Sequence, residues 1–323
     1  MFLGDNMKKF WQDGLLVIIV GLIIPMGIVS LFSRTRSRPL ENIPPTSETV
    51  LIREKELVSV LMNDGKSVVM DMDTYLTGVV LAEMPAEFEQ DALKAQAVVA
   101  RTYTRKRMTT RKKHSDGDVC VSPDCCQAYC AEQEYLARGE CRDMLNKVKA
   151  AIKATSGQVL IYGEDYIEAT YFSCSGGKTE DAVAVWGSDI PYLQAVESPG
   201  EESASHYTDT VTFQKEEIKA KLGIDSDIKV QSVSYTGGGG VDTITISGKE
   251  FTGTQMRTLL GLRSTAFSMT VLGDSVTVTT KGFGHRVGMS QYGAQAMAKS
   301  GSDYKEILAH YYQGATLVQD KEH

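Results

Sequence analysis

The feature that most constrains this chain is an uninterrupted apolar run near its N-terminus. Residues 15–32 read LLVIIVGLIIPMGIVSLF and contain no charged side chain. A run of this length is a candidate for crossing a bilayer as a helix. A buried core helix fits poorly, because the segment is apolar on every side and polar at both ends. The folded part of the chain is therefore expected to lie beyond this run.

The residues around the apolar run leave two interpretations open. A cleaved signal peptide is one, but no small-x-small cleavage site follows, so we favour an uncleaved membrane anchor. Basic residues stand on both sides of the run, so charge alone does not settle its orientation. We predict four parts in the chain: a tail at 1–14, a transmembrane helix at 15–32, a proline-containing linker at 33–50 and a folded domain at 51–323.

The domain after the linker is expected to mix helices with antiparallel hairpins. A hairpin is predicted at 57–72 around Asp64-Gly65, and others at 158–173, 229–247 and 267–280. Helices are predicted at 73–81, 86–107, 144–155, 254–260 and 304–312, with another ending near residue 300. Because no regular strand–helix alternation is present, we predict an α+β fold with two lobes around a substrate cleft. The net charge of −7 argues against a nucleic-acid partner.

Glu83 stands at a break between two predicted helices. Pro85 disfavours helical backbone at the residue before it, so one helix should end near Glu83. Proline also suits the first turn of the next helix. Lys94 and Arg101 are seven residues apart on that second helix and share a face. A corner carboxylate beside a basic stripe suits a polar substrate, but residue types alone favour a solvated helix terminus.

A histidine and several cysteines cluster in a predicted loop at about 110–142. His114, Cys120 and Cys126 are evenly spaced, with five residues between neighbours. Three such ligands suit Zn²⁺, with a fourth position left to water or another group. Two disulfides with spare thiols are the alternative to zinc. Beside the zinc site, Cys130–Cys141 is a candidate for a separate disulfide, which a location outside the cytoplasm would permit.

Two glycine-containing loops carry hydroxyl, amide and aromatic side chains. Neither has the glycine spacing of a P-loop or a dinucleotide fingerprint, so we exclude nucleotide sites there. The polar side chains would suit a neutral sugar polymer. His285 could instead hold only its own loop, and Tyr292 could belong to the core. The candidate residues are Tyr171, Ser173, Ser175 and Thr179 on one loop and His285, Ser290, Gln291 and Tyr292 on the other.

Five motifs in this order resemble the stage II sporulation protein D family, which includes amidase-enhancer proteins. They are YLTGVVLAEMP at 75–85, ALKAQAVVART at 92–102, DVCVSPDCCQAY at 118–129, YFSCSGGKT at 171–179 and GHRVGMSQYG at 284–293. The resemblance extends from about residue 50 to the C-terminus. Arg286 departs from it, because many relatives have glycine there.

The resemblance implies a lytic transglycosylase that cleaves peptidoglycan between N-acetylmuramic acid and N-acetylglucosamine. The C6 hydroxyl of the muramic acid attacks its own C1 and leaves a 1,6-anhydro end, so one carboxylate can replace the usual glycosidase pair. Glu83 would be the catalytic acid and base, which requires a raised pKa. We expect Lys94 and Arg101 to hold sugar or the local scaffold. The other expected substrate-binding residues are Tyr171, Ser175, Thr179, His285, Gln291 and Tyr292.

The resemblance also implies a place of action. Residues 1–14 would be cytoplasmic, and residues 51–323 would lie outside the cytoplasm, on the mother-cell membrane facing the forespore during engulfment. Expected partners are glycan strands stripped of stem peptides, a sporulation amidase and a membrane scaffold protein. Zinc held by His114, Cys120 and Cys126 is expected to be structural rather than catalytic. The alternative is a non-catalytic glycan-binding protein that enhances an amidase.

Overall fold

The computed structural model describes residues 56–109 and 112–320, which belong to one compact unit, Arg53–His323. The predicted tail, transmembrane helix and linker lie outside the described residues. Within the described ranges, no helix combines the length and apolar character needed to cross a bilayer. The described chain mixes helices with mainly antiparallel sheets, which confirms the α+β class.

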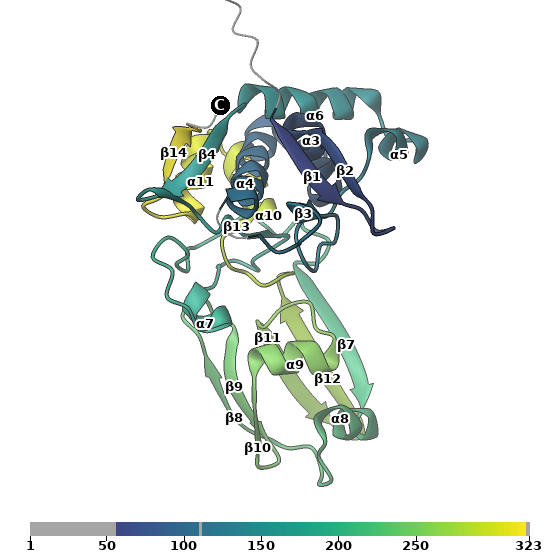
Figure 1. The fold of residues 1–323 in the computed structure, drawn as a ribbon. Coiled ribbons are helices and arrows are strands. Elements are labelled where there is room, and N and C mark those ends of the chain that lie inside the picture. Colours follow the sequence, from purple (N-terminus) through teal and green to yellow (C-terminus); the bar gives the residue numbers. More distant parts are fainter. Residues whose placement is uncertain (1–55, 110–111, 321–323) are drawn as a thin grey trace, which may run out of the picture. The chain divides into compact units, whose positions relative to one another are not determined.

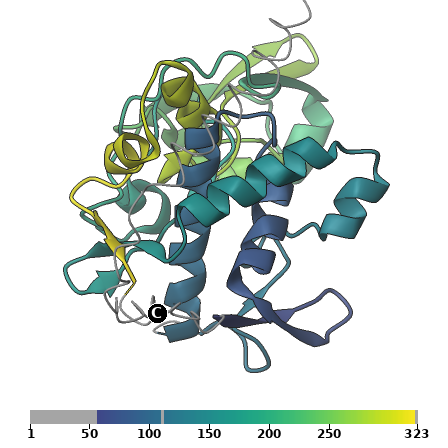
Figure 2. The ribbon, with the colours of Figure 1, turned by 90° about the horizontal axis from the view of Figure 1, so that it is seen from above.

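The first of two large hydrophobic cores is built around helix α4, Gln90–Thr109. Small buried side chains such as Ala95, Ala97 and Ala100 allow other helices to approach α4 closely. Figures 1 and 2 show α4 at the centre of this helical group. Its helical neighbours are α3 (Met72–Glu83), α6 (Arg142–Ala154), α10 (Gln291–Lys299) and α11 (Tyr304–Tyr311).

Small sheets and short helices complete this part of the molecule. One sheet has the order β2-β1-β3, another has the order β14-β4-β5, and β6 pairs in parallel with β13. The elements are β1 (Leu57–Leu61), β2 (Ser67–Asp71), β3 (Val119–Cys120), α5 (Glu132–Ala137), β4 (Gln158–Tyr162), β5 (Asp165–Tyr166), β6 (Tyr171–Phe172), α7 (Ala182–Trp186), β13 (Met289–Ser290) and β14 (Thr316–Gln319).

The second core lies between two antiparallel sheets and two helices (Figure 1). The sheets have the orders β11-β12-β7 and β10-β9-β8. Their alternating burial places side chains such as Val276, Val278 and Ile244 in this core. The elements are β7 (Thr208–Gln214), α8 (Lys215–Leu222), β8 (Val230–Tyr235), β9 (Val241–Ile246), β10 (Lys249–Thr252), α9 (Gly253–Leu260), β11 (Phe267–Leu272) and β12 (Ser275–Lys281).

The helix boundaries around Glu83 were predicted only in part. Helix α3 does end at Glu83, with Met84 in extended backbone, but its N-cap is Asp71 rather than Asp73. The Asp71 carboxylate accepts a hydrogen bond from the backbone N–H of Thr74 at 3.0 Å. Helix α4 begins at Gln90, later than predicted, because residues 85–89 form a turn in which the Phe88 N–H donates to the Pro85 carbonyl.

The second predicted hairpin is also shorter than expected. Strands β4 and β5 pair only near their turn, and the following residues form β6, which pairs with β13. Met289 lies opposite Tyr171 in this parallel register. The pairing brings the two polar loops of the sequence side by side, which local sequence periodicity does not reveal.

Gly78 provides a test of packing in the first core. A Cβ at this position would overlap the ring of Tyr129, which stacks on Tyr75 with ring centroids 6.0 Å apart. Alanine normally stabilises a helix interior by about 1 kcal/mol relative to glycine. We expect the overlap to dominate, so Gly78→Ala should lower the free energy of unfolding by about 1–3 kcal/mol.

Urea unfolding measures this effect, and a double-mutant cycle with Tyr129→Ala isolates its cause. The penalty of Gly78→Ala should largely disappear when the Tyr129 ring is removed. Stabilisation by Gly78→Ala in the otherwise unchanged protein would contradict the packing argument.

Candidate active site

Glu83 is the last residue of α3 and is half-buried. Its Oε1 accepts a hydrogen bond from the backbone N–H of Ala128 at 2.7 Å. Burial raises the pKa of Glu83, while the bonds from Ala128 and the Tyr171 side chain partly oppose the rise. Burial therefore dominates and favours the protonated carboxyl, which is the form that a general acid requires.

Glu83 lies where two cavities meet. The larger, which we call the main cavity, has a volume of about 540 Å³, and the second cavity has about 350 Å³. Both are lined by Glu83, Ser173 and Gln291. A chain-like ligand could thus pass Glu83 with contacts on both sides of its carboxyl.

Several residues expected at the site do line these cavities. Tyr171, His285 and Gln291 line the main cavity, and Tyr292 lines the second. The parallel pairing of β6 with β13 holds the Tyr171 strand beside the loop that carries His285 and Gln291. The structure therefore brings these four residues together with Glu83.

His285 is positioned as a neutral polar group. Its Nδ1 accepts a hydrogen bond from the backbone N–H of Val287 at 3.1 Å. Burial, followed by the charge of Arg257, lowers the pKa of His285 to about 4. Its ring also packs against Trp186 and Phe172, with centroid distances of 5.4 and 5.6 Å. His285 thus holds its own loop and also faces the cavity.

Ser175 and Thr179 are not among the residues that line either cavity. Both are buried, and the Ser175 Oγ donates to the Glu201 carboxylate at 2.9 Å. The Thr179 Oγ accepts from the backbone N–H of Val196 at 2.8 Å. Their hydrogen bonds stabilise the loop behind the cavity, so the structure does not support substrate contact by these two residues.

Lys94 and Arg101 likewise lie away from the two cavities. Lys94 forms an ion pair with Asp91 at 3.1 Å on its own helix. Arg101 is 1% exposed, and its guanidinium donates to the backbone carbonyl of Thr155 at 2.7 Å. Of the two roles expected for these residues, sugar binding and local scaffold, their contacts support the scaffold.

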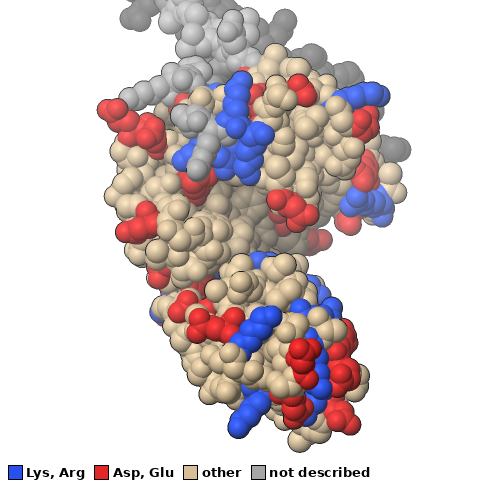
Figure 3. All heavy atoms as spheres, turned by 60° about the horizontal axis from the view of Figure 1, so that its bottom comes forward, with Lys and Arg blue, Asp and Glu red and all other residues tan. Residues whose placement is uncertain are grey.

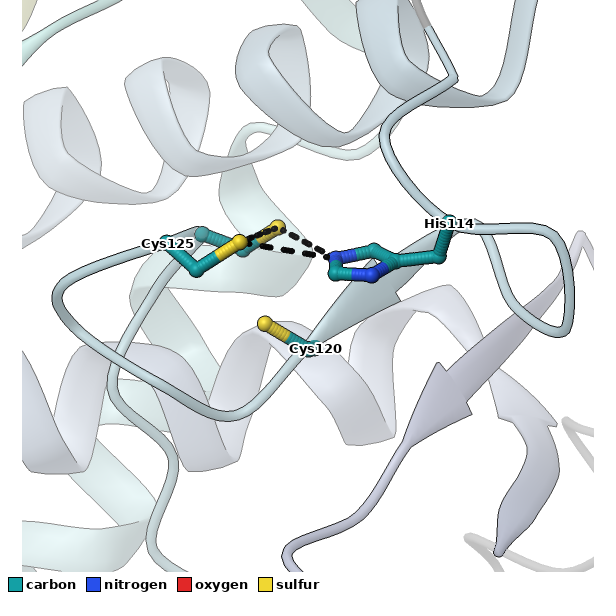
Figure 4. Close-up of side chains that lie close together, drawn as sticks. His114, Cys120 and Cys125 are labelled. Atoms are coloured by element: carbon teal, nitrogen blue, oxygen red, sulfur yellow. Dashed lines mark hydrogen bonds between the residues drawn. The ribbon is translucent and has the colours of Figure 1, made fainter. Parts of the chain in front are cut away.

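The predicted metal ligands come together with one additional cysteine. The ligand atoms of His114, Cys120, Cys125 and Cys126 all lie within 4.8 Å of one another. Figure 4 shows the side chains of His114, Cys120 and Cys125 pointing toward one another. The His114 Nε2 is 3.4 Å from the Cys126 Sγ and 3.7 Å from the Cys125 Sγ. A tetrahedral zinc ion with Zn–S bonds of about 2.3 Å separates its ligands by about 3.8 Å. The four residues therefore fit a closed zinc site.

The thiols of this cluster have different proton affinities. Burial is the largest influence on Cys126, but hydrogen bonds from the Cys120 backbone and His114 outweigh it and lower the Cys126 pKa to about 7. Burial raises the pKa of Cys120 to about 11. Outside the cluster, Cys130 and Cys141 are free thiols, so the suggested disulfide is not formed in this structure.

On the face shown in Figure 3, one group of basic side chains stands out in the upper part of the molecule, and smaller acidic and basic groups lie elsewhere. Acidic and basic residues are interspersed there over a mostly uncharged surface.

Comparisons with known proteins identify the family of the chain. The family described as "Stage II sporulation protein" matches residues 64–162. Stage II sporulation protein D of Bacillus amyloliquefaciens is 36% identical over 96% of this chain and 95% of that protein. The chain belongs to the stage II sporulation protein D family. The Bacillus subtilis (strain 168) member is 40% identical over 77% of this chain and 74% of its own.

A more distant relative has a different name. The "Amidase enhancer" of Bacillus subtilis (strain 168) is 30% identical over 75% of this chain and 40% of that protein. Membership of the stage II sporulation protein D family and this relative link the chain to sporulation and the cell wall.

Several residues of this family member's site were missed in the sequence. Arg257, Phe172 and Phe283 line the main cavity, and Cys125 joins the metal cluster. Cys125 stands next to Cys126, so a ligand search that allowed adjacent residues could have found it. Arg257 lies on a short helix of the second core, and no motif or spacing around it in the sequence predicts a site residue.

The raised pKa of Glu83 leads to a stability prediction. The unfolded chain ionises a glutamate at about pH 4.3, whereas folded Glu83 keeps its proton to higher pH. Above that pH, ionisation of Glu83 in the folded protein therefore lowers the free energy of unfolding. We expect Glu83→Gln, which retains an acceptor for the Ala128 N–H, to raise the urea midpoint at about pH 7 but not at about pH 4.

Glu87→Gln is the matched control, because Glu87 is an exposed carboxylate that follows Glu83 closely in the chain. It should leave the midpoint nearly unchanged at both pH values. A midpoint for Glu83→Gln below that of the wild type at neutral pH would contradict the proposed burial cost.

Proposed function

We propose that this protein is a membrane-anchored peptidoglycan lytic transglycosylase that acts on glycan strands stripped of stem peptides. The observation that carries the proposal is the Glu83 carboxyl, which has a raised pKa and lies where two cavities meet. The other carboxylates lining these cavities, Asp124, Glu87 and Glu140, are exposed to solvent. Chemistry that needs one buried acid therefore fits this site best.

The proposed reaction uses Glu83 twice. Its carboxyl protonates the glycosidic oxygen, which leaves as the C4 hydroxyl of N-acetylglucosamine while the bond to C1 of N-acetylmuramic acid breaks. The C6 hydroxyl of the same muramic acid attacks C1, and the Glu83 carboxylate accepts its proton. The carboxyl is thereby regenerated, and the product has a 1,6-anhydro end. Tyr171, His285, Gln291 and Tyr292 would orient the sugars.

The family and the N-terminal sequence support a proposal for the wider role of the protein. We place residues 15–32 in the mother-cell membrane, with residues 1–14 in the cytoplasm and the catalytic domain facing the forespore. Work during engulfment with a cell-wall amidase and a membrane scaffold protein is consistent with family membership. The amidase-enhancer relative supports the link to an amidase.

A zinc ion is the proposed cofactor, and its role is structural. His114, Cys120, Cys125 and Cys126 would hold it with all four positions filled, whereas catalytic zinc sites keep one position open. The ordered loop then leads to Ala128, whose N–H holds the Glu83 carboxyl. Zinc would thus help to orient the Glu83 carboxyl without taking part in the reaction.

A non-catalytic enhancer of an amidase is the second candidate, favoured by the name of the 30% identical relative. Product analysis separates the two. Wild-type protein incubated with denuded glycan should release anhydro-ended products, detected by mass spectrometry. Glu83→Gln should lower their release by about 10²–10⁴-fold, the usual contribution of general acid–base catalysis.

Glu89→Gln, at an exposed glutamate that lines neither cavity, should leave product release close to the wild-type rate. Reducing ends in place of anhydro ends would indicate hydrolysis and overturn the lytic mechanism. Absence of any product, together with stimulation of an amidase that survives Glu83→Gln, would establish the enhancer.

The zinc proposal predicts a metal-dependent stability. Elemental analysis should find one zinc ion per chain, and His114→Ala and Cys125→Ser should each reduce its content. Because structural zinc binding contributes directly to folding free energy, each change should lower the melting temperature by about 10 °C or more. Cys141→Ser, at an exposed cysteine outside the cluster, is the control and should retain the metal. Full zinc content in His114→Ala would refute the assignment.

A further inference from the structure

Arg257 presents a positive charge to the main cavity without a carboxylate partner. It lies on α9 and is half-buried, and it lines the same cavity as Glu83 and His285. No ion pair joins it to any acid in residues 56–109 or 112–320. By contrast, Arg263 pairs with Asp209 at 2.9 Å and Arg286 with Glu180 at 3.3 Å.

The other titratable groups of the cavity do not neutralise Arg257. No ion pair joins Arg257 to Glu83, and Arg257 is not among the causes that shift the pKa of Glu83, which burial raises. His285 stays neutral at neutral pH because its pKa is about 4, and burial raises the pKa of Tyr103 and Tyr171. Asp124 is solvent-exposed, and Cys126 belongs to the proposed zinc site.

Burial of the Arg257 guanidinium costs free energy, which binding of a negatively charged ligand group could offset. Desolvation lowers the pKa of Arg257, and no neighbouring acid offsets this effect. A partly buried cation without a counter-charge is unfavourable, and a carboxylate that reaches it gains strong, bidentate hydrogen bonds. The cavity is therefore electrostatically complementary to a ligand with one negative group among neutral polar ones.

A denuded glycan strand has this pattern. Its sugars are neutral except for the lactyl ether of each muramic acid, which ends in a free carboxylate once the stem peptide has been removed. While the stem peptide is attached, this carboxyl group is part of an amide bond, which has no charge and only one oxygen. Recognition of this carboxylate would let a site distinguish stripped strands from intact ones.

We propose that Arg257 binds the lactyl carboxylate of a muramic acid residue and so makes the site selective for glycan without stem peptides. The inference rests on the proposed function, because it assigns the substrate preference to a residue of the same cavity. Arg257 reaches the cavity from the second core, whereas Glu83 belongs to the first. Substrate selection and proton transfer would thus come from separate parts of the chain.

Binding measurements in the Glu83→Gln background test the proposal without turnover. Isothermal titration would compare denuded (GlcNAc–MurNAc) oligosaccharides with the same oligosaccharides whose lactyl carboxyls are converted to methylamides. A hydrogen-bonded charge contributes about 1.5–3 kcal/mol, so the acid form should bind about 10- to 100-fold more tightly. Additional Arg257→Gln should remove this preference, and Arg257→Lys should restore part of it.

Lys281→Gln is the matched control, because it removes one positive charge from an exposed position outside the cavity. The preference for the acid form should persist in this variant. Equal affinities for the two oligosaccharides with Arg257 present, or an equal loss of preference in Lys281→Gln, would overturn the proposal.

Product analysis of the wild-type enzyme separates this inference from the proposed reaction. An Arg257-dependent preference without anhydro products would support the carboxylate site and reject the transglycosylase. Anhydro products released equally from acid and methylamide strands would support the transglycosylase and reject the role of Arg257.

Discussion

The buried ion pair between Arg286 and Glu180 holds together the segments that surround the site. Both side chains are at most 2% exposed, and Arg286 also donates to the backbone carbonyls of Ser175, Lys178 and Gly238. The network ties the loop behind the cavity to the turn between β8 and β9. Loss of one partner would leave a buried charge uncompensated, which typically costs about 3–5 kcal/mol. Arg286 adopts a left-handed φ of 67°, which glycine tolerates more easily.

The position of the Glu83 carboxyl also depends on two segments that are distant from each other in the sequence. Pro85 and the end of α3 fix the backbone of Glu83, while the N–H of Ala128 holds its carboxyl. Gln127 alone separates Ala128 from Cys126, so the order of that loop bears on the orientation of the Glu83 carboxyl. The same loop contributes Cys126 to the lining of the main cavity. The loop that carries the His114 and cysteine cluster thus also holds the Glu83 carboxyl and lines the main cavity.

Local signals predicted many elements correctly and failed where distant segments meet. The hairpin at 267–280 and the end of α3 were confirmed, because alternation and proline chemistry act over a few residues. Ser175 and Thr179 were expected to contact sugar, yet their hydroxyls bond to Glu201 and Val196 behind the cavity. Hydroxyl side chains can bind sugar or stabilise a loop, and the sequence does not show which side of a loop faces the cavity.

The sequence by itself determined the α+β class, the position of Glu83 at a helix end and the grouping of His114 with cysteines. Each depends on periodicity, capping or close spacing, which are local properties of the chain. Only the tertiary structure decided that Cys125 joins His114, Cys120 and Cys126 and that Arg257 shares a cavity with Glu83. Arg257 and Glu83 are far apart in the chain and belong to different cores. The pairings and the buried ion pair that join those cores are long-range interactions, so no local pattern encodes the charge that Arg257 places in the cavity.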